Sequence, residues 1–429
     1  MIRTNLKIAA TAHAAGFQLT EQSALALGRA YAGIGVDGTD VSGIYYNPAT
    51  MTLHPGTQVQ LGAIGVGLNL DLRGDDGDYK ENGRAKEEII PHGFITHQIN
   101  DSTWVGLSIT VPFGLATNYD KDWAHSELGT DAKITVINFN PNFAWKATDK
   151  ISIGAGIALQ YVDAKFGVTA DMAHLTGGQM QGTVHNEYSA DNFTWGFNVG
   201  LMWAPLDNLR FGISYRSETK HATDGTLKTE ASGVTQLRPG MSLDGLLSGS
   251  RDASVTVSGP AWAMFNAAWD VNDYLSLYAT FRWADWSSFK SLKTEGVDMS
   301  QVSALNPFVD QALGKMANIE NNWEDTYLYS LGYDLRVNSF WTLRGGIAYE
   351  TSAIGDSKKR TALIPDADRW WFAIGSSFHW TKDFQTDIGF AHLHGVHERS
   401  LYSRTTGEEV AHYRKMDAYL LGVQMQYRF

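Results

Sequence analysis

Hydrophobic and polar residues alternate along several stretches of this chain. In 151–161 the odd positions are isoleucine, leucine, alanine or tyrosine, whereas every even position is small or polar. Segments 209–217 and 341–349 repeat the pattern, with large apolar residues opposite arginine, glycine, serine or threonine. A period of two residues predicts β-strands with one apolar face. The small residues on the other face are typical of a crowded interior.

About fourteen such segments follow residue 56, an even number, as single-chain bacterial barrels require. They span 57–71, 89–99, 103–113, 133–148, 151–168, 191–206, 208–220, 253–270, 274–292, 324–337, 340–352, 367–380, 383–395 and 412–429. Short connections alternate with long ones near 72–88, 114–132, 169–190, 221–252, 293–323, 353–366 and 396–411. Short periplasmic turns and long extracellular loops are the pattern of membrane barrels. The sequence therefore predicts an all-β fold, a transmembrane antiparallel β-barrel of about 14 strands.

The first 56 residues differ from the rest. Residues 1–14 combine basic residues, a short apolar stretch and an Ala-x-Ala site, the features of a signal peptide remnant. We therefore expect the mature chain to begin at Ala15. Residues 15–56 mix a short helical stretch with glycine-rich turns and do not resemble a strand. We expect the barrel itself to occupy 57–429.

Composition narrows the class of protein. The chain has no cysteine, which excludes disulfides and thiolate metal sites, and its formal net charge of -12 argues against a nucleic-acid partner. No apolar run is long enough for a transmembrane helix, so a barrel is the structure that would satisfy its backbone in lipid. The last strand ends at Phe429 and resembles the signal read by outer-membrane assembly machinery. We expect a monomer in the outer membrane of a Gram-negative bacterium, in contact with lipid and lipopolysaccharide.

Several short motifs stand in order along the chain: Ala15-Gly16-Phe17-Gln18-Leu19, 27–33, Asn47-Pro48-Ala49, 114–117, 215–218, 286–289 and 364–370. Together they resemble the FadL-type long-chain fatty acid transporters. The resemblance implies that 15–56 is an N-terminal hatch that plugs the lumen of the barrel. It places Phe17, with Gly16 and Leu19 beside it, at a ligand-binding position. The basic residues of that family near the ligand head group find no clear counterpart, since Val168 stands where one would be.

The third predicted strand, 103–113, contains Pro112, and Gly114 follows two residues later. Proline cannot donate to a strand ladder and is confined to edges, strand starts or bulges. The residues alone favour an ordinary strand end, whereas the resemblance implies a kink that opens the wall. On that basis we predict a lateral opening at Pro112, Phe113, Gly114 and Leu115. We expect it to face the hatch motif Asn47-Pro48-Ala49.

Other candidate sites are weaker. The pattern G-x-G-x-x-G at 33–38 lacks the strand and helix that a dinucleotide site needs. The H-x-H-x-x-H motif of His392, His394 and His397 has no carboxylate arrangement in sequence that completes a metal site. Acidic residues of the first long loop, Asp75, Asp76 and Asp78, fit a solvated loop. We expect no cofactor, no metal and no catalytic residue, and a protein that is not an enzyme.

The leading hypothesis is a passive channel that takes up long-chain fatty acids or similar hydrophobic molecules, with lateral release at the third strand. An aromatic hydrocarbon channel of the same family is the nearest alternative. A general porin, or a structural or adhesive surface barrel, is the more distant one. A polar porin needs an open, charged lumen without a plug, so segment 15–56 separates these hypotheses.

Overall fold

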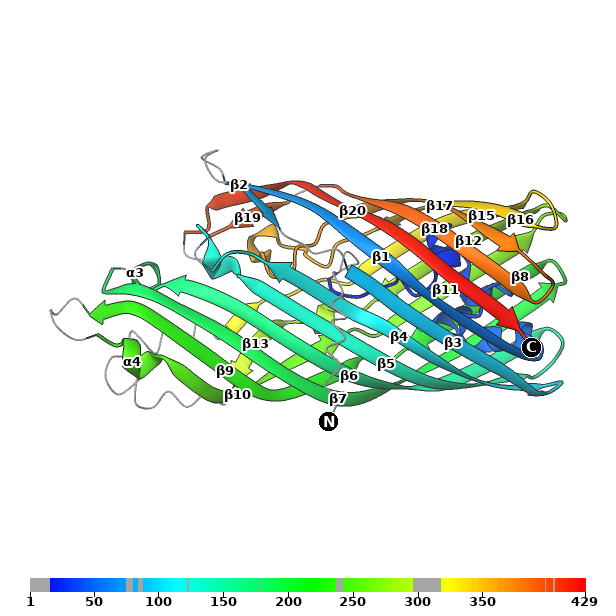
Figure 1. Ribbon diagram of the computed structural model, residues 1–429, viewed down its shortest axis with the longest axis horizontal. Helices are drawn as coiled ribbons and strands as arrows, with labels where there is room; N and C mark the ends of the chain where they lie inside the picture. The colour runs from blue at the N-terminus through cyan, green and yellow to red at the C-terminus, as the bar shows by residue number, and fades with distance from the viewer. Residues whose placement is uncertain are drawn as a thin grey trace.

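The computed structural model describes residues 16–74, 80–83, 88–121, 123–176, 178–236, 242–295, 318–397, 399–403 and 406–429. The strands form a closed antiparallel barrel, because the first strand, β1, pairs with the last, β20. Figure 1 shows these two strands side by side, tilted against the long axis. Asp75, Asp76 and Asp78, like the predicted signal remnant 1–14, lie outside the described residues.

The barrel has 14 strands, which confirms the predicted architecture. Two strands of the wall are interrupted, so each carries two labels, β8 with β9 and β10 with β11. The wall consists of β1 (Thr57–Gly74), β3 (Glu88–Asn100), β4 (Thr103–Asn118), β5 (Asp131–Lys146), β6 (Ile151–Asp171), β7 (Met180–Leu206), β8 (Leu209–Arg216), β9 (Thr219–Gln236), β10 (Gly249–Gly259), β11 (Trp262–Asp270), β12 (Leu275–Ala284), β15 (Thr326–Arg336), β16 (Trp341–Glu350), β17 (Arg369–His379), β18 (Phe384–Gly395) and β20 (Glu409–Arg428).

Short elements lie in the connections between wall strands. They are β2 (Lys80–Gly83), η3 (Ser126–Leu128), α3 (Met172–Leu175), α4 (Asp244–Leu247), η4 (Trp286–Ser288), β13 (Ser291–Glu295), β14 (Asn318–Glu320), η5 (Ser357–Lys359) and β19 (Ser400–Tyr402). Among the described residues, no helix is long and apolar enough to cross a membrane.

The alternation seen in the sequence separates the two faces of the wall. On β5 the outward side chains of Phe139 and Phe143 are exposed, whereas Asn138, Asn140 and Asn142 point inward and are buried. The other wall strands repeat this arrangement, with exposed isoleucine, leucine, valine and aromatic side chains around the barrel. An apolar outer face is what a barrel in lipid requires.

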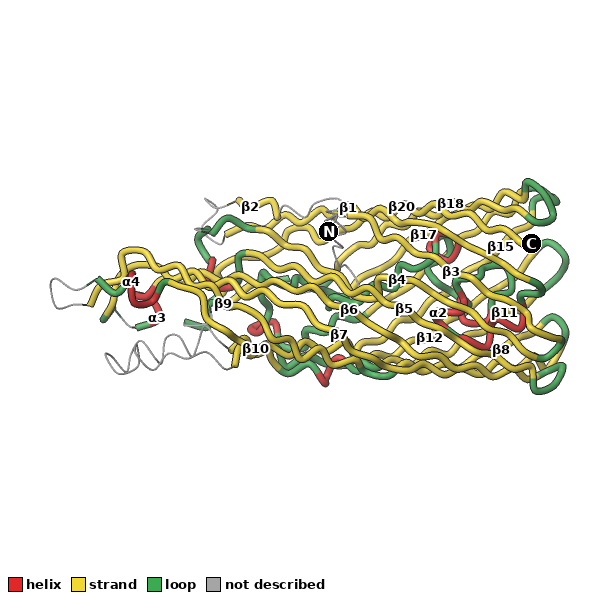
Figure 2. Tube along the Cα trace, turned by 60° about the horizontal axis from the view of Figure 1, so that its bottom comes forward, coloured by secondary structure: helices red, strands yellow, loops and turns green. Residues whose placement is uncertain are grey.

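Two hairpins extend far beyond the length that a membrane needs. β7 has 27 residues, whereas a tilted strand crosses a bilayer in about 9–11. We expected 169–190 and 221–252 to be loops, but β6 pairs with β7 up to Asp171 and β9 with β10 up to Gly249. Beyond the length that crosses a bilayer neither face needs to be apolar, so the sequence can lose the apolar alternation although the backbone pairing continues. Figure 2 shows them projecting past the rest of the barrel, with α3 and α4 at their ends.

Residues 16–56 fold inside the barrel as a hatch. They form the short elements α1 (Ala24–Leu27), η1 (Ile34–Val36), α2 (Gly43–Tyr46) and η2 (Pro48–Leu53), almost entirely buried. These elements touch opposite sides of the wall, since α1 packs on β17, β18 and β20 while η2 packs on β5, β6 and β7. The hatch therefore spans the lumen, as the resemblance implied.

Candidate functional site

The pairing between β3 and β4 ends part-way up the wall. The last pair is Gly93 with Ile109, yet β4 continues to Asn118. On its other side β4 stays paired with β5, but the register slips between Thr110 and Phe113. Pro112 therefore lies in a bulge inside the strand, which is the position that proline tolerates. The bulge leaves one edge of β4 without β3 as its partner.

The N-terminal end of the hatch occupies this free edge. The amide of Leu19 donates to the carbonyl of Pro112 (2.8 Å), and the amide of Gly114 donates to the carbonyl of Phe17 (3.0 Å). Gln22 adds two side-chain hydrogen bonds to the backbone of Val111. A bare strand edge is unfavourable because its polar groups lack partners. Residues 17–22 thus replace the missing β3 neighbour and close the break from inside.

Phe17 lies in a cluster of four other aromatic side chains and is only 1% exposed. Its ring centroid is 4.9 Å from Trp286, 5.7 Å from Phe289, 5.8 Å from Phe113 and 6.2 Å from Trp323. We call these five residues the Phe17 cluster. The cluster joins the predicted ligand position to the predicted opening, because Phe113 belongs to the bulge of β4.

Gly16 and Leu19 flank Phe17, and both are buried. Gly16 has φ +67, and a Cβ there would lie 2.5 Å from the Trp323 ring, so a larger residue has no room. Nearby, burial raises the pKa of Glu21 to about 8. Burial outweighs the opposing effect of Arg369 and Arg282 on the pKa of this carboxyl group.

The hatch motif Asn47-Pro48-Ala49 lies away from the Phe17 cluster, against another part of the wall. The Asn47 side chain donates to the carbonyls of Gly35 (2.9 Å) and Leu201 (3.2 Å). Three glycines of the wall permit this fit, since a Cβ on any of them would meet Asn47, Pro48, Ala49 or Gly35; they are Gly154, Gly200 and Gly212. The motif thus packs on β6, β7 and β8, whereas we expected it to face Pro112–Leu115.

Comparison with known proteins identifies the family. The pattern of the family described as "Outer membrane protein transport protein (OMPP1/FadL/TodX)" matches residues 5–429. The chain belongs to this family. It is therefore an outer-membrane transport protein, as the resemblance implied.

Relatives and solved structures agree with this assignment. The "47 kDa outer membrane protein" of Pasteurella multocida is 29% identical over 98% of this chain and 96% of its own length. The "Long-chain fatty acid transport protein" of Escherichia coli (strain K12) is 27% identical over 90% of each chain. The crystal structure of a Pseudomonas aeruginosa FadL homologue has a TM-score of 0.83 at 23% identity, covering 97% of this chain and 100% of the other. The Pseudomonas putida toluene transporter TodX has a TM-score of 0.71 at 17% identity, covering 95% and 98%. These two structures show the same fold.

In this member of the family, a buried ionic network fixes the middle of the hatch. Arg29 pairs with Asp37 of the hatch and with Asp334 of β15, the latter at 3.0 Å. Asp334 also accepts from Arg344 of β16 at 3.2 Å, and Arg344 lies 3.7 Å from Asp387 of β18. The Arg29 guanidinium covers the Tyr278 ring at 4.0 Å. Each of these charges has an opposite charge beside it, so the network ties the hatch to three wall strands.

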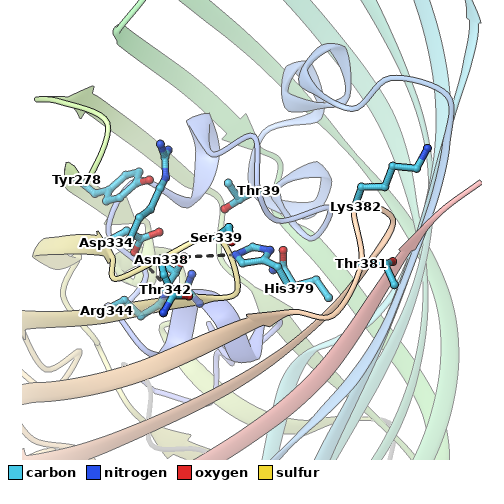
Figure 3. Close-up of a pocket in the computed structure, with 12 residues that line it drawn as sticks. Thr39, Tyr278, Asp334, Asn338, Ser339, Thr342, Arg344, His379, Thr381 and Lys382 are labelled. Carbon is cyan, nitrogen blue, oxygen red and sulfur yellow. Dashed lines mark hydrogen bonds and ion pairs between the residues drawn. The ribbon is translucent and has the colours of Figure 1, made fainter.

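A polar cavity of roughly 530 Å³ lies at the short-turn end of the barrel (Figure 3). Thr39 of the hatch, Asp334 and Arg344 of the network, and the turn residues Asn338 and Lys382 line it. Short turns face the periplasm in membrane barrels. A cavity with charged walls holds water better than hydrocarbon, so it does not suit an apolar ligand.

The H-x-H-x-x-H motif divides into two parts. His392 and His394 share one face of β18, and their ring nitrogens lie 3.9 Å and 2.7 Å from Asp417 of β20. His397 instead contacts Asp368 at 2.9 Å. The carboxylate beside the first two histidines was hidden in the sequence, because β20 pairs with β18 across a long connection.

Sequence reasoning missed several members of the site. Trp286 and Phe289 belong to the motif 286–289, and Trp286 also fits an interfacial aromatic near a strand end, but neither position predicted contact with Phe17; Trp323 belongs to no motif. The sequence did not show that these rings meet Phe17, because Phe17 is far from them along the chain and only the closed barrel brings them together. The one sequence feature that pointed toward these rings is the short run of aromatic and small residues at 286–289, directly after a strand.

Proposed function

We propose that this outer-membrane protein is a passive channel for long-chain fatty acids or similar hydrophobic molecules, which leave sideways into the membrane beside β4. One observation carries the proposal. The N-terminal end of the hatch closes a break in the wall, and its Phe17 ring lies in the same aromatic cluster as Phe113 of the break. A ligand that displaces Phe17 from this cluster would also loosen the segment that closes the break.

The energetics favour a lateral exit for an apolar ligand. Burial of an acyl chain gives roughly 0.8 kcal/mol per CH₂, so an aqueous exit would lose that free energy again. A gap in the wall passes the chain from protein to lipid without exposing it to water. The polar cavity below the hatch makes the periplasmic direction still less favourable for hydrocarbon.

The relatives named long-chain fatty acid transport proteins support a fatty acid as the substrate. An aromatic hydrocarbon is the second candidate, because the neighbours in structure include toluene transporters and five aromatic rings gather at the site. Rings pack well against rings in edge-to-face contacts. Both candidates use the same pathway and require no chemical step.

Growth on a sole carbon source tests the substrate. We expect a strain without this gene, and without a related gene that compensates, to lose growth on oleate and to regain it when the gene is returned. Restored growth on toluene but not on oleate would favour the second candidate. Unchanged growth on both would contradict the proposal.

Gly114→Leu tests the lateral route. Gly114 is buried and donates its amide to Phe17, so a leucine there should push into the break while the barrel still assembles. We expect oleate uptake to fall strongly and surface binding of oleate to persist. Gly67→Leu on β1 is the matched control, since a Cβ at Gly67 meets nothing nearer than 3.9 Å. Normal uptake by Gly114→Leu, with the break shown to be filled, would contradict lateral release.

A further inference from the structure

The inner face of the wall changes from apolar to polar part-way along the barrel. On β5 the inward residues are apolar up to Val136 and then become Asn138, Asn140 and Asn142. On β6 the same change falls between Val162 and Gln160, which lie beside Val136 and Asn138. Asn140, Asn142 and Asn198 of β7 bond to one another through their amides. We call this level of the lumen the polar layer.

Arg216 lies in the polar layer at the end of β8. It is opposite Asn198 on one side and Trp262 on the other, and it is 3% exposed. Its Nη2 donates to the carbonyl of Tyr45 (2.8 Å) and to Oδ1 of Asn140 (2.9 Å). Its Nε and Nη1 have no acceptor within the described part of the chain.

Four other buried arginines, Arg29, Arg344, Arg282 and Arg369, differ from Arg216 because each has a carboxylate partner. Arg29 pairs with Asp37 and Asp334, and Arg344 with Asp334. Arg282 pairs with Glu350, and Arg369 pairs with Asp366 at 2.6 Å. Arg216 has no carboxylate within ion-pair distance among the described residues; besides the two oxygen acceptors of Nη2, the rings of Tyr45 (4.5 Å) and Trp262 (5.7 Å) lie against its charge.

A buried guanidinium without an opposite charge is costly, because arginine stays protonated and loses its hydration. The two aromatic faces offset only part of that cost. An anion that accepts from Nε or Nη1 would supply the missing charge through a charge-assisted hydrogen bond. The surroundings of Arg216 therefore suit an anionic group.

Buried apolar side chains connect this position with the Phe17 cluster. Trp262, beside Arg216, belongs to the same hydrophobic core as Phe17 and Phe113. The Phe113 ring lies against Gly259, whose strand partner is Thr219, three residues after Arg216. An apolar chain that displaces these side chains would extend from Phe17 to the polar layer.

We propose that Arg216 binds the carboxylate of the transported molecule, so that the lumen selects hydrophobic monocarboxylates over neutral hydrocarbons. This inference rests on the proposed function and deepens it. The acyl chain lies on the apolar wall, and Arg216 orients it by its charged end.

The test compares oleate with oleyl alcohol, which has the same chain and a neutral end. Equilibrium binding to the purified full chain is measured for the natural protein and for Arg216→Met. We expect the natural protein to prefer oleate, and Arg216→Met to lose roughly tenfold to a hundredfold in oleate affinity, the range of one hydrogen bond to a charged group. Affinity for oleyl alcohol should change less than about twofold, and Arg216→Lys should recover part of the loss for oleate.

Arg210→Met is the control variant, because Arg210 lies on the same face of β8 but pairs with Asp270. It should bind oleate as the natural protein does. Equal loss of both ligands in Arg216→Met would show a structural role, and an unchanged oleate affinity would show that only water contacts Arg216; either result overturns the inference. Equal affinity of the natural protein for both ligands would also overturn it but leave the channel intact. Failure of the natural protein to bind either ligand would instead contradict the proposed function.

Discussion

Two parts of the hatch, residues 16–22 and residues 24–53, are held to the wall by different contacts. Residues 24–53 are fixed by the ion pairs of Arg29 and by the insertion of Asn47 and Pro48 between glycines of β6, β7 and β8. Residues 16–22 are held by ring contacts around Phe17 and by hydrogen bonds to the edge of β4, to Arg282 and to Tyr46, with no ion pair among the described residues. An apolar ligand can replace ring contacts, but it cannot replace a buried ion pair. We therefore expect the N-terminal end to move during transport while residues 24–53 stay in place.

The largest effect should come from breaking the ion pairs that hold residues 24–53. Arg29→Met leaves Asp37 buried without its partner and removes one partner of Asp334, which costs about 3–5 kcal/mol for a buried pair. We expect hydrogen exchange of 24–53 to rise sharply while the barrel keeps its β-strand circular dichroism. Arg336→Met, at an exposed turn, should change little. If exchange of 24–53 stayed as slow as in the natural protein, the ion pairs would not be what fixes the hatch.

A smaller effect should come from a substitution within residues 16–22. Phe17→Ala removes the ring at the centre of the Phe17 cluster, a change that costs about 3–5 kcal/mol in a protein core and should cost less at a ligand site. We expect weaker oleate binding in a direct assay, with the barrel intact. Phe139→Ala, on the outward face of β5, serves as the control. An affinity equal to that of the natural protein would remove Phe17 from the ligand site.

The sequence predicted the wall better than the site, for a physical reason. Lipid on one face imposes an alternation that any strand within the membrane must show, as in 151–161. Where β6 and β7 continue beyond the membrane, lipid no longer imposes this alternation. The sequence therefore predicts loops in segments that the structure shows as strands.

The site depends instead on contacts that the closed barrel creates. Phe17 and Pro112 could be named from the resemblance, but the meeting of Phe17 with Trp286 and Trp323 required the fold. The position of Asn47 on β6–β8 was missed because it depends on glycines that give no local signal of a close approach.

The central claim is that residues 16–22 must leave the edge of β4 for transport. Gln18 and Phe113 are directly opposite each other, and the hydrogen bonds of their neighbours make them a non-hydrogen-bonded pair. The Cα atoms of such a pair lie about 4.5 Å apart, within reach of a disulfide. The chain has no cysteine of its own, so a single engineered bond can form in Gln18→Cys/Phe113→Cys.

Oleate uptake by this double variant, measured oxidised and again after reduction, tests the claim most directly. The account predicts that uptake is lost in the oxidised protein and returns on reduction to the level of the Phe113→Cys single variant. Surface binding of oleate should persist in both states. Equal uptake by the fully oxidised and the reduced protein would contradict it, because the N-terminal end would then stay on β4 throughout transport.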